Sequence, residues 1–212
     1  MGVLSNYGEL KEAVQSYAKR STAAFTANLP VFVMRAHSTM MRDLDAIPLL
    51  QQTADLTINA ERVSLPADFR AVVRLSIDSD WDNPLSPTSI ELRQRAAIVN
   101  PVGRPSVFAL EGDKIAFGPN PGSGTGYTGR LLYKRALDFF ANDLAANALL
   151  TRYPFAYLYG ALAEAYGFDK FEEERTAYEA LFRSEIADIN AAERLNASGG
   201  GVMLPSSSGA VV

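Results

Sequence analysis

The chain has 212 residues, of which 48% are apolar and 21% are charged, a balance typical of a globular protein with a buried core. It has 0 cysteines and 1 histidine, His37, which excludes disulfides, cysteine-zinc sites and thiol nucleophiles and leaves little material for a Ser-His-Asp triad. The net charge of −4 disfavours a protein whose main task is to grip nucleic-acid phosphates, because such proteins carry a basic excess. No apolar run approaches the roughly 20 residues of a membrane helix, and we expect no signal peptide, since residues 1–20 are polar and charged. The composition favours a binding or assembly role without cofactor or metal.

Helical patterns open the chain. Asn6 can cap a first helix, and Glu9 three residues later completes a pair that resembles a capping box. A second helix is predicted to follow Asn28, with Pro30 in its first turn and Pro48 at its end. Its apolar stripe recurs at helical spacing and consists of Leu29, Phe32, Val33, Ala36, Met40 and Leu44.

The middle of the chain has the pattern of strands. Apolar and polar residues alternate over 56–65, and β-branched residues gather over 71–77. Residues 106–110 and 114–117 flank a Glu-Gly-Asp turn, which predicts a β-hairpin. The other predicted segments are a loop over 78–87, a short helix over 89–97, a Gly-rich loop over 118–126 and a strand over 127–134.

Helical spacing returns in the C-terminal third. A short helix is predicted over 142–150, and another begins at Pro154 and ends at Gly167. The longest helix is predicted to begin at Asp169, with three glutamates at 172–174 near the positive end of its dipole. Its expected buried side consists of Phe171, Tyr178, Leu181, Phe182, Ile186 and Ile189.

Together these patterns predict an α+β fold that is mainly helical. Two N-terminal helices and a C-terminal helical pair are expected to form a bundle, into which a β-rich region of hairpins is inserted. We expect residues 1–196 to form a single domain, helical over 6–47 and 142–196, with the β-rich insertion over 51–134. Residues 197–212 are rich in Gly and Ser and are expected to form a flexible tail.

No motif in the sequence indicates a catalytic or metal site. Gly124-Thr-Gly126-Tyr-Thr-Gly129 matches the letters of the dinucleotide fingerprint, but a strand rather than a helix is predicted after it, which favours a loop. Three alternating aspartates over 78–82 resemble a calcium loop without its glycine and distal glutamate. His37 has neither a cysteine nor a second histidine as a fellow ligand, so a structural or interface role is favoured.

Six arginines are scattered through the β-rich region. We expect them to lie on a solvated surface with local ion pairs rather than to contact DNA; they are Arg62, Arg70, Arg74, Arg93, Arg95 and Arg104.

Two groups of apolar residues are candidates for contact with another protein. A tail that served only solubility would need no apolar residues, whereas a short apolar segment can dock into a groove or extend a partner's sheet. The tail candidates are Val202, Met203, Leu204, Val211 and Val212. The second group, a candidate contact with a neighbouring subunit, consists of Trp81, Phe108 and Phe117.

Three stretches, in this order along the chain, resemble tailed-bacteriophage head-to-tail adaptor (connector) proteins. They are Asn6-Tyr-Gly-Glu-Leu-Lys-Glu-Ala-Val, Glu61-Arg-Val-Ser-Leu-Pro-Ala-Asp-Phe-Arg and Leu149-Leu-Thr-Arg-Tyr-Pro-Phe-Ala-Tyr-Leu-Tyr-Gly-Ala-Leu-Ala-Glu-Ala-Tyr. The likeness continues through Tyr178-Glu-Ala-Leu-Phe and Ile186-Ala-Asp-Ile-Asn-Ala-Ala, and it covers most of residues 6–195.

The resemblance implies a structural protein of the virion neck that carries no catalytic activity. About twelve copies are expected to form a ring beneath the portal, matching its rotational symmetry. The implied partners are the portal protein, tail or neck proteins such as stopper, nozzle or tail-tube proteins, and double-stranded DNA that passes without sequence-specific binding. Such a protein is made and assembled in the host bacterial cytoplasm and does not contact a membrane.

Three alternatives remain open at this point. The chain could be another neck component, such as a stopper or tail-completion protein, which also forms rings. It could be a carboxylate-dependent hydrolase that uses the glutamates at 172–174, although a solvated helix start explains them equally well. A small DNA-binding regulator is disfavoured by the acidic net charge.

Overall fold

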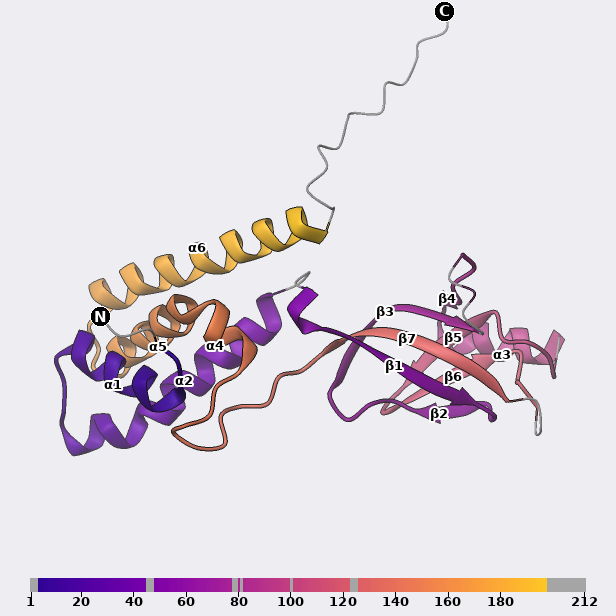
Figure 1. The fold of residues 1–212 in the computed structure, drawn as a ribbon, viewed down its shortest axis with the longest axis horizontal. Helices are drawn as coiled ribbons and strands as arrows, with labels where there is room; N and C mark the ends of the chain where they lie inside the picture. Colours follow the sequence, from indigo (N-terminus) through magenta and orange to yellow (C-terminus); the bar gives the residue numbers. More distant parts are fainter. Residues whose placement is uncertain are drawn as a thin grey trace, which may run out of the picture. The chain divides into compact units, whose positions relative to one another are not determined.

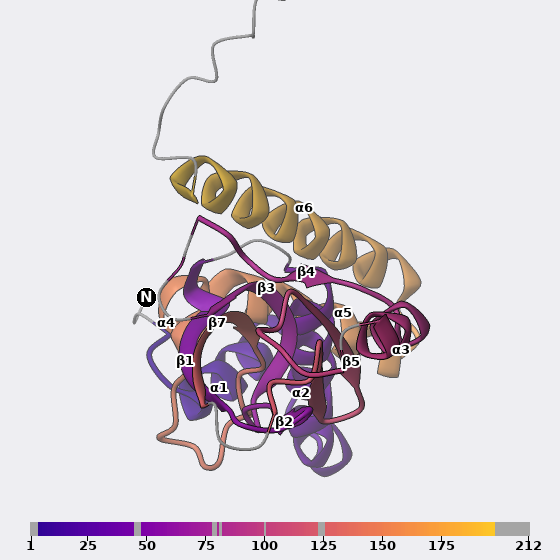
Figure 2. The same cartoon turned by 90° about the vertical axis from the view of Figure 1, so that its right-hand side faces the viewer.

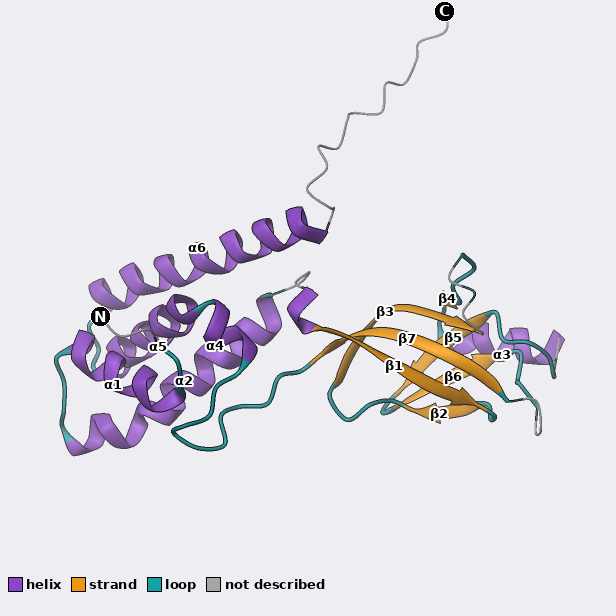
Figure 3. Ribbon diagram, in the orientation of Figure 1, coloured by secondary structure: helices purple, strands orange, loops and turns teal. Residues whose placement is uncertain are grey.

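A computed structural model of the chain describes residues 4–44, 48–77, 80, 82–99, 101–122 and 126–197. It divides into two compact units, Leu50–Ala136 and the combination of Met1–Leu49 with Leu137–Val212. The first is here called the β unit and the second the helical unit (Figures 1 and 3). The fold is α+β and mainly helical, with 49% helix and 24% strand, as the sequence predicts. Whether residues 1–196 act as a single domain stays a prediction.

The helical unit is built around one central helix. Its described helices are α1 (Tyr7–Ala18), α2 (Ala23–Asp43), α4 (Ala148–Arg152), α5 (Pro154–Phe168) and α6 (Glu172–Ala197). Helix α5 packs against α1, α2 and α6, so most of its side chains are buried (Figure 1). At Gly160, helix α5 lies so close to α2 and α6 that a Cβ added to this glycine would lie 2.8 Å from the Cβ of Ala36 in α2 and 2.9 Å from the ring of Phe182 in α6.

The N-terminal helices confirm one predicted start and correct the other. The Asn6 side chain caps α1 by accepting a hydrogen bond of 2.9 Å from the backbone of Glu9. Helix α2 begins at Ala23, earlier than predicted, because Thr22 provides the cap, and Pro30 lies inside the helix. A proline there removes one backbone hydrogen bond, and the burial of neighbouring apolar side chains on α2 offsets this loss. All six residues of the predicted apolar stripe are buried.

The C-terminal helices differ from prediction at several of their ends. Helix α4 begins at Ala148 rather than at 142, because the side chain of Asn147 accepts a hydrogen bond from Leu150 and caps it. Helix α5 begins at Pro154 as predicted and extends one residue past Gly167. Helix α6 begins at Glu172, because Lys170 has a left-handed φ of 62° that separates it from α5.

The buried side of α6 is also narrower than predicted. Phe182, Ile186 and Ile189 are buried as expected, and Tyr178 is half-buried. Phe171 and Leu181, by contrast, are exposed. Phe171 lies just before the first residue of α6, and its ring contacts Tyr166 of α5 from the surface.

The β unit consists of two facing sheets and a short helix (Figures 1 and 2). One sheet has the order β1-β7-β3 and the other β2-β6-β5-β4, and a core of ten buried side chains from both sheets and from Leu85 joins them. The predicted hairpin is confirmed as β5 and β6, which pair with Glu111 opposite Lys114. The bounds are β1 (Gln51–Ile58), β2 (Arg62–Ser64), β3 (Phe69–Ile77), β4 (Ser86–Pro87), α3 (Ile90–Val99), β5 (Val107–Glu111), β6 (Lys114–Gly118) and β7 (Tyr127–Arg135).

Candidate interaction surfaces

The described part of the chain holds no cluster of three or more His, Asp or Glu side chains that could bind a metal ion. The glutamates at 172–174 lie exposed along the first turn of α6, and Glu172 pairs with Arg175 at 3.3 Å. Strand β7 begins at Tyr127, so Gly126 and Gly129 lead into and lie within a strand, as predicted, and not at a helix N-terminus. No helix among the described residues is long and apolar enough to span a membrane.

His37 belongs to a buried hydrogen-bond network in the helical unit. Its Nε2 lies 3.0 Å from the carbonyl oxygen of Leu137, which can only accept, so Nε2 carries the proton. Its Nδ1 therefore accepts from the hydroxyl of Tyr157 at 2.7 Å, and the same hydroxyl oxygen accepts from the side-chain amide of Asn147 at 2.9 Å. Every polar atom of this network has a partner, which gives His37 a structural role.

Burial keeps this network neutral. It lowers the pKa of His37 and raises the pKa of Tyr157, because in each case the charged form would lose its hydration. Since Asn147 also caps α4, the network joins α2, α5 and the segment through which the chain re-enters the helical unit.

Arg93 corrects the prediction that the arginines of the β unit lie on a solvated surface. Its side chain is 2% exposed, and its guanidinium donates to Glu61 and, at 3.1 Å, to Glu111. Gly118 gives it room, because a Cβ there would lie 3.2 Å from the Arg93 side chain. Arg62 completes the cluster with a hydrogen bond of 2.6 Å to Glu111, and that bond is the main reason why the pKa of Glu111 is lowered.

The Arg93 cluster anchors α3 to Glu111 of β5 and to Glu61, the residue before β2. The partners Glu61 and Glu111 lie 32 and 18 residues from Arg93 in the sequence, so no local sequence signal identifies the contact.

Large apolar side chains lie exposed on α3 and just after it, namely Leu92, Ile98, Val99 and Val102. Exposed apolar side chains this close together are typical of interaction sites, and the sequence analysis missed them.

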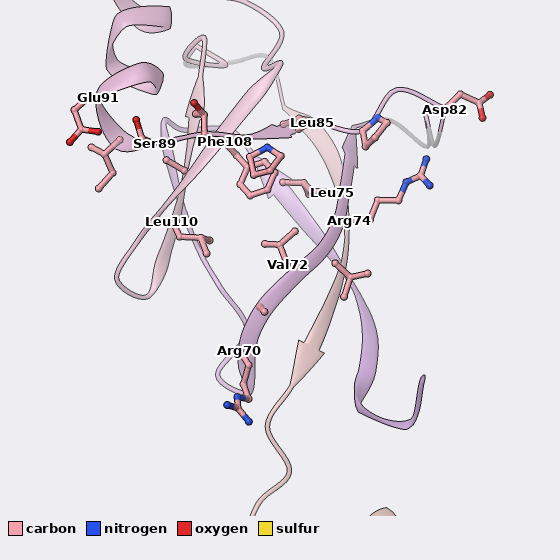
Figure 4. Close-up of a pocket in the computed structure, with 17 residues that line it drawn as sticks. Arg70, Val72, Arg74, Leu75, Asp82, Leu85, Ser89, Glu91, Phe108 and Leu110 are labelled. Carbon is pink, nitrogen blue, oxygen red and sulfur yellow. The ribbon is translucent and has the colours of Figure 1, made fainter. Parts of the chain in front are cut away.

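An apolar groove of about 1080 Å³ opens beside α3, between β3 and β5 (Figure 4). Buried Leu75, Leu85 and Phe108 form part of its lining, while Val72 and Leu110 point into it from opposite strands. The charged side chains of Arg70, Asp82 and Glu91 lie around it. Strand β3 is the edge of its sheet, and beyond β5 the other sheet has only the two-residue β4. The groove therefore lies where both sheets end.

A second exposed apolar surface lies on the helical unit. We call it the aromatic strip; it consists of Phe155, Tyr159, Tyr166, Phe171 and Tyr178. Its rings contact one another across α5 and α6, with centroid distances of 6.3 Å between Tyr159 and Tyr178 and 5.3 Å between Tyr166 and Tyr178. Phe155 and Phe171 are exposed, and the three tyrosines are half-buried. Tyr and Phe are enriched at protein interfaces, because they offer large apolar area with a polar tip.

The structure also locates the residues that the sequence suggested for contact. Phe108 and Phe117 are 4% and 0% exposed and belong to the core of the β unit, so they offer little surface of their own to a neighbouring subunit, although Phe108 forms part of the groove lining. Their place in the paired strands β5 and β6 turns them inward. Trp81 and the tail residues Val202, Met203, Leu204, Val211 and Val212 lie outside the described residues.

The described surfaces thus have the chemistry of an assembly protein: a helical unit interrupted by an inserted β unit, each with exposed apolar side chains. The family model described as SU10 adaptor protein matches residues 5–203. The chain therefore belongs to the SU10 adaptor protein family, and the resemblance to phage head-to-tail adaptors is confirmed. No curated protein matches the chain.

Proposed function

We propose that this phage adaptor forms a ring between the portal and the tail through which the genome passes. The observation that carries the proposal is the family match over residues 5–203, which spans both units. About twelve copies would match the symmetry of the portal. The site of action would be the neck of the virion, after assembly in the host cytoplasm, with neck or tail proteins bound on the far side of the ring.

The distribution of apolar surface supports ring formation. A closed ring is built from heterologous contacts, in which one surface of a subunit meets a different surface of the next. The chain offers such different surfaces in the aromatic strip of the helical unit and in α3 and the groove of the β unit. The net charge of −4 is compatible with DNA that slides through the ring, since a strongly basic protein would bind its phosphates.

The tail beyond α6 is proposed to contribute to assembly by docking on the portal or on an adjacent subunit. A variant that ends at Asn196 tests this role. We expect it to fold like the full chain, because the described hydrogen bonds between α6 and the rest of the helical unit lie before that residue, and to assemble poorly with the portal. Unchanged assembly would remove the tail from the proposal.

The mass of the purified chain, alone and mixed with the portal protein of the same phage, tests the ring directly. We expect a particle whose added mass corresponds to about twelve chains of 23.0 kDa. Many weak contacts can close such a ring once the portal presents many sites together, so the chain alone can stay monomeric. Binding only to a preformed portal–adaptor complex, and not to the portal itself, would instead identify a stopper or tail-completion protein.

A further inference from the structure

The apolar groove of the β unit and one segment of the tail match in chemistry. Residues 197–212 contain no charged side chain, and 202–204 (Val202, Met203 and Leu204) are three consecutive apolar residues between a Gly run and Pro205. The groove walls offer apolar side chains that are 40% or more exposed, those of Val73, Ile90 and Leu110.

The geometry of the groove suits an extended segment. Strand β3 is an edge strand that pairs with β7 on one side, and edge strands accept an added strand through their backbone groups. On its other side the carbonyl oxygen of Leu75 already accepts from the backbone N–H of Leu85 at 2.8 Å, so an added segment would pair with the part of β3 before Leu75. In an extended conformation Val202 and Leu204 point to the same side, toward the groove, while Met203 points away. Pro205 lacks an N–H and would end the pairing after these three residues.

We propose that segment 202–204 of one copy docks along β3 in the groove of the next copy around the ring. The inference rests on the ring proposed above, and it assigns one heterologous contact: a donor segment after the helical unit and an acceptor groove in the β unit. The family match ends at residue 203 and so includes Val202 and Met203, which supports a role for this part of the tail. Five residue steps from Ala197 to Val202 span at most roughly 17 Å, so the receiving groove lies within that distance of the end of α6 of the donor copy.

Disulfide crosslinking tests the contact, because the chain has 0 cysteines of its own. An affinity-tagged chain carrying Leu204→Cys is mixed with an untagged chain carrying Leu110→Cys, assembled with the portal and oxidised. We expect a crosslinked pair of the two chains in the ring fraction. The matched control replaces Leu110→Cys by Val99→Cys, a position on α3 that is 76% exposed and does not line the groove, and should crosslink about tenfold less.

A double variant with Leu110→Cys and Leu204→Cys in one chain distinguishes docking on the next copy from docking of the segment on the groove of its own chain. Crosslinked oligomers of several chains are expected, because each chain in the ring is donor to one neighbour and acceptor for the other. A disulfide within one chain would overturn the assignment to the next copy. In a second measurement, Leu204→Asp should lower ring yield about tenfold, while the control Ser207→Asp, with the same charge three residues later, should stay within about twofold.

The readouts separate the two proposals. Rings of full mass without the crosslink, or equal ring yields for Leu204→Asp and Ser207→Asp, overturn the docking of 202–204 and leave the adaptor ring intact. Samples that never form a ring with the portal overturn the proposed function, and the docking falls with it.

Discussion

Replacing Arg93 by methionine should loosen α3 from the β unit. Removing one member of a buried ion pair costs about 3–5 kcal/mol when its partner stays buried without compensation. Here the Glu61 side chain is 35% exposed, and Glu111 keeps Arg62 as a second partner, so both carboxylates retain some stabilisation. We therefore expect a loss of about 2 kcal/mol in the free energy that holds α3 closed, or roughly a 30-fold rise in its open fraction.

Amide hydrogen exchange of peptides from α3 in the full chain measures this change. Exchange should become faster in Arg93→Met over 90–99, while peptides from α5 in the helical unit should exchange as before. The control is Arg62→Met, which removes a side chain that is 45% exposed and should cost less than about 1 kcal/mol. Equal exchange of α3 in the two variants would refute the view that Arg93 anchors this helix.

Three further predictions concern the helical unit. Gly160→Ala should lower the free energy of unfolding by about 1–3 kcal/mol although alanine favours helix, because the new Cβ would lie 2.8 Å from the Cβ of Ala36. Urea unfolding checks this. The control is Gly126→Ala, because no atom lies within 4 Å of a Cβ added at Gly126. Tyr157→Phe should cost about 1–3 kcal/mol in the same assay, because it leaves the buried Nδ1 of His37 and the half-buried amide of Asn147 without their partner, and an unchanged midpoint would contradict the network. Burial lowers the pKa of His37 from its ordinary 6.5, so below that pH the unfolded chain binds a proton at His37 more readily than the folded chain does. The contribution of His37 to stability is therefore full above about pH 6.5 and falls as the pH drops below it. His37→Gln should flatten this part of the plot of unfolding free energy against pH.

The sequence correctly predicted those ends of helices and strands that are set by residues close by in the chain. Asn6 caps α1, Pro154 begins α5, and a Glu-Gly-Asp turn joins β5 to β6, because each feature satisfies or frees backbone groups within a few residues. The start of α2 was missed, since two possible caps, Thr22 and Asn28, precede the same stripe, and only packing decides between them.

The interaction surfaces could not be predicted in the same way, because distant residues create them. Arg93 looks like any surface arginine until the fold places Glu61 and Glu111 around it. Phe108 looks like a candidate contact until the two sheets cover it. The groove exists only because β3, at the edge of one sheet, faces β5, which has only the two-residue β4 beyond it in the other sheet. Leu181 is exposed because of the way α6 is rotated about its axis against α5. A stripe of six apolar residues does not fix that rotation to better than a fraction of a turn, so the sequence alone could not predict it.

The first and last strands of the β unit are direct neighbours, with Gln51 opposite Lys134 at the end where the chain enters and leaves. A module whose two ends meet in this way can be enlarged, exchanged or excised without rethreading the helices around it. The whole β unit is encoded by one continuous stretch, residues 50–136, so it can be replaced as a single piece while the sequence of the helical unit stays unchanged.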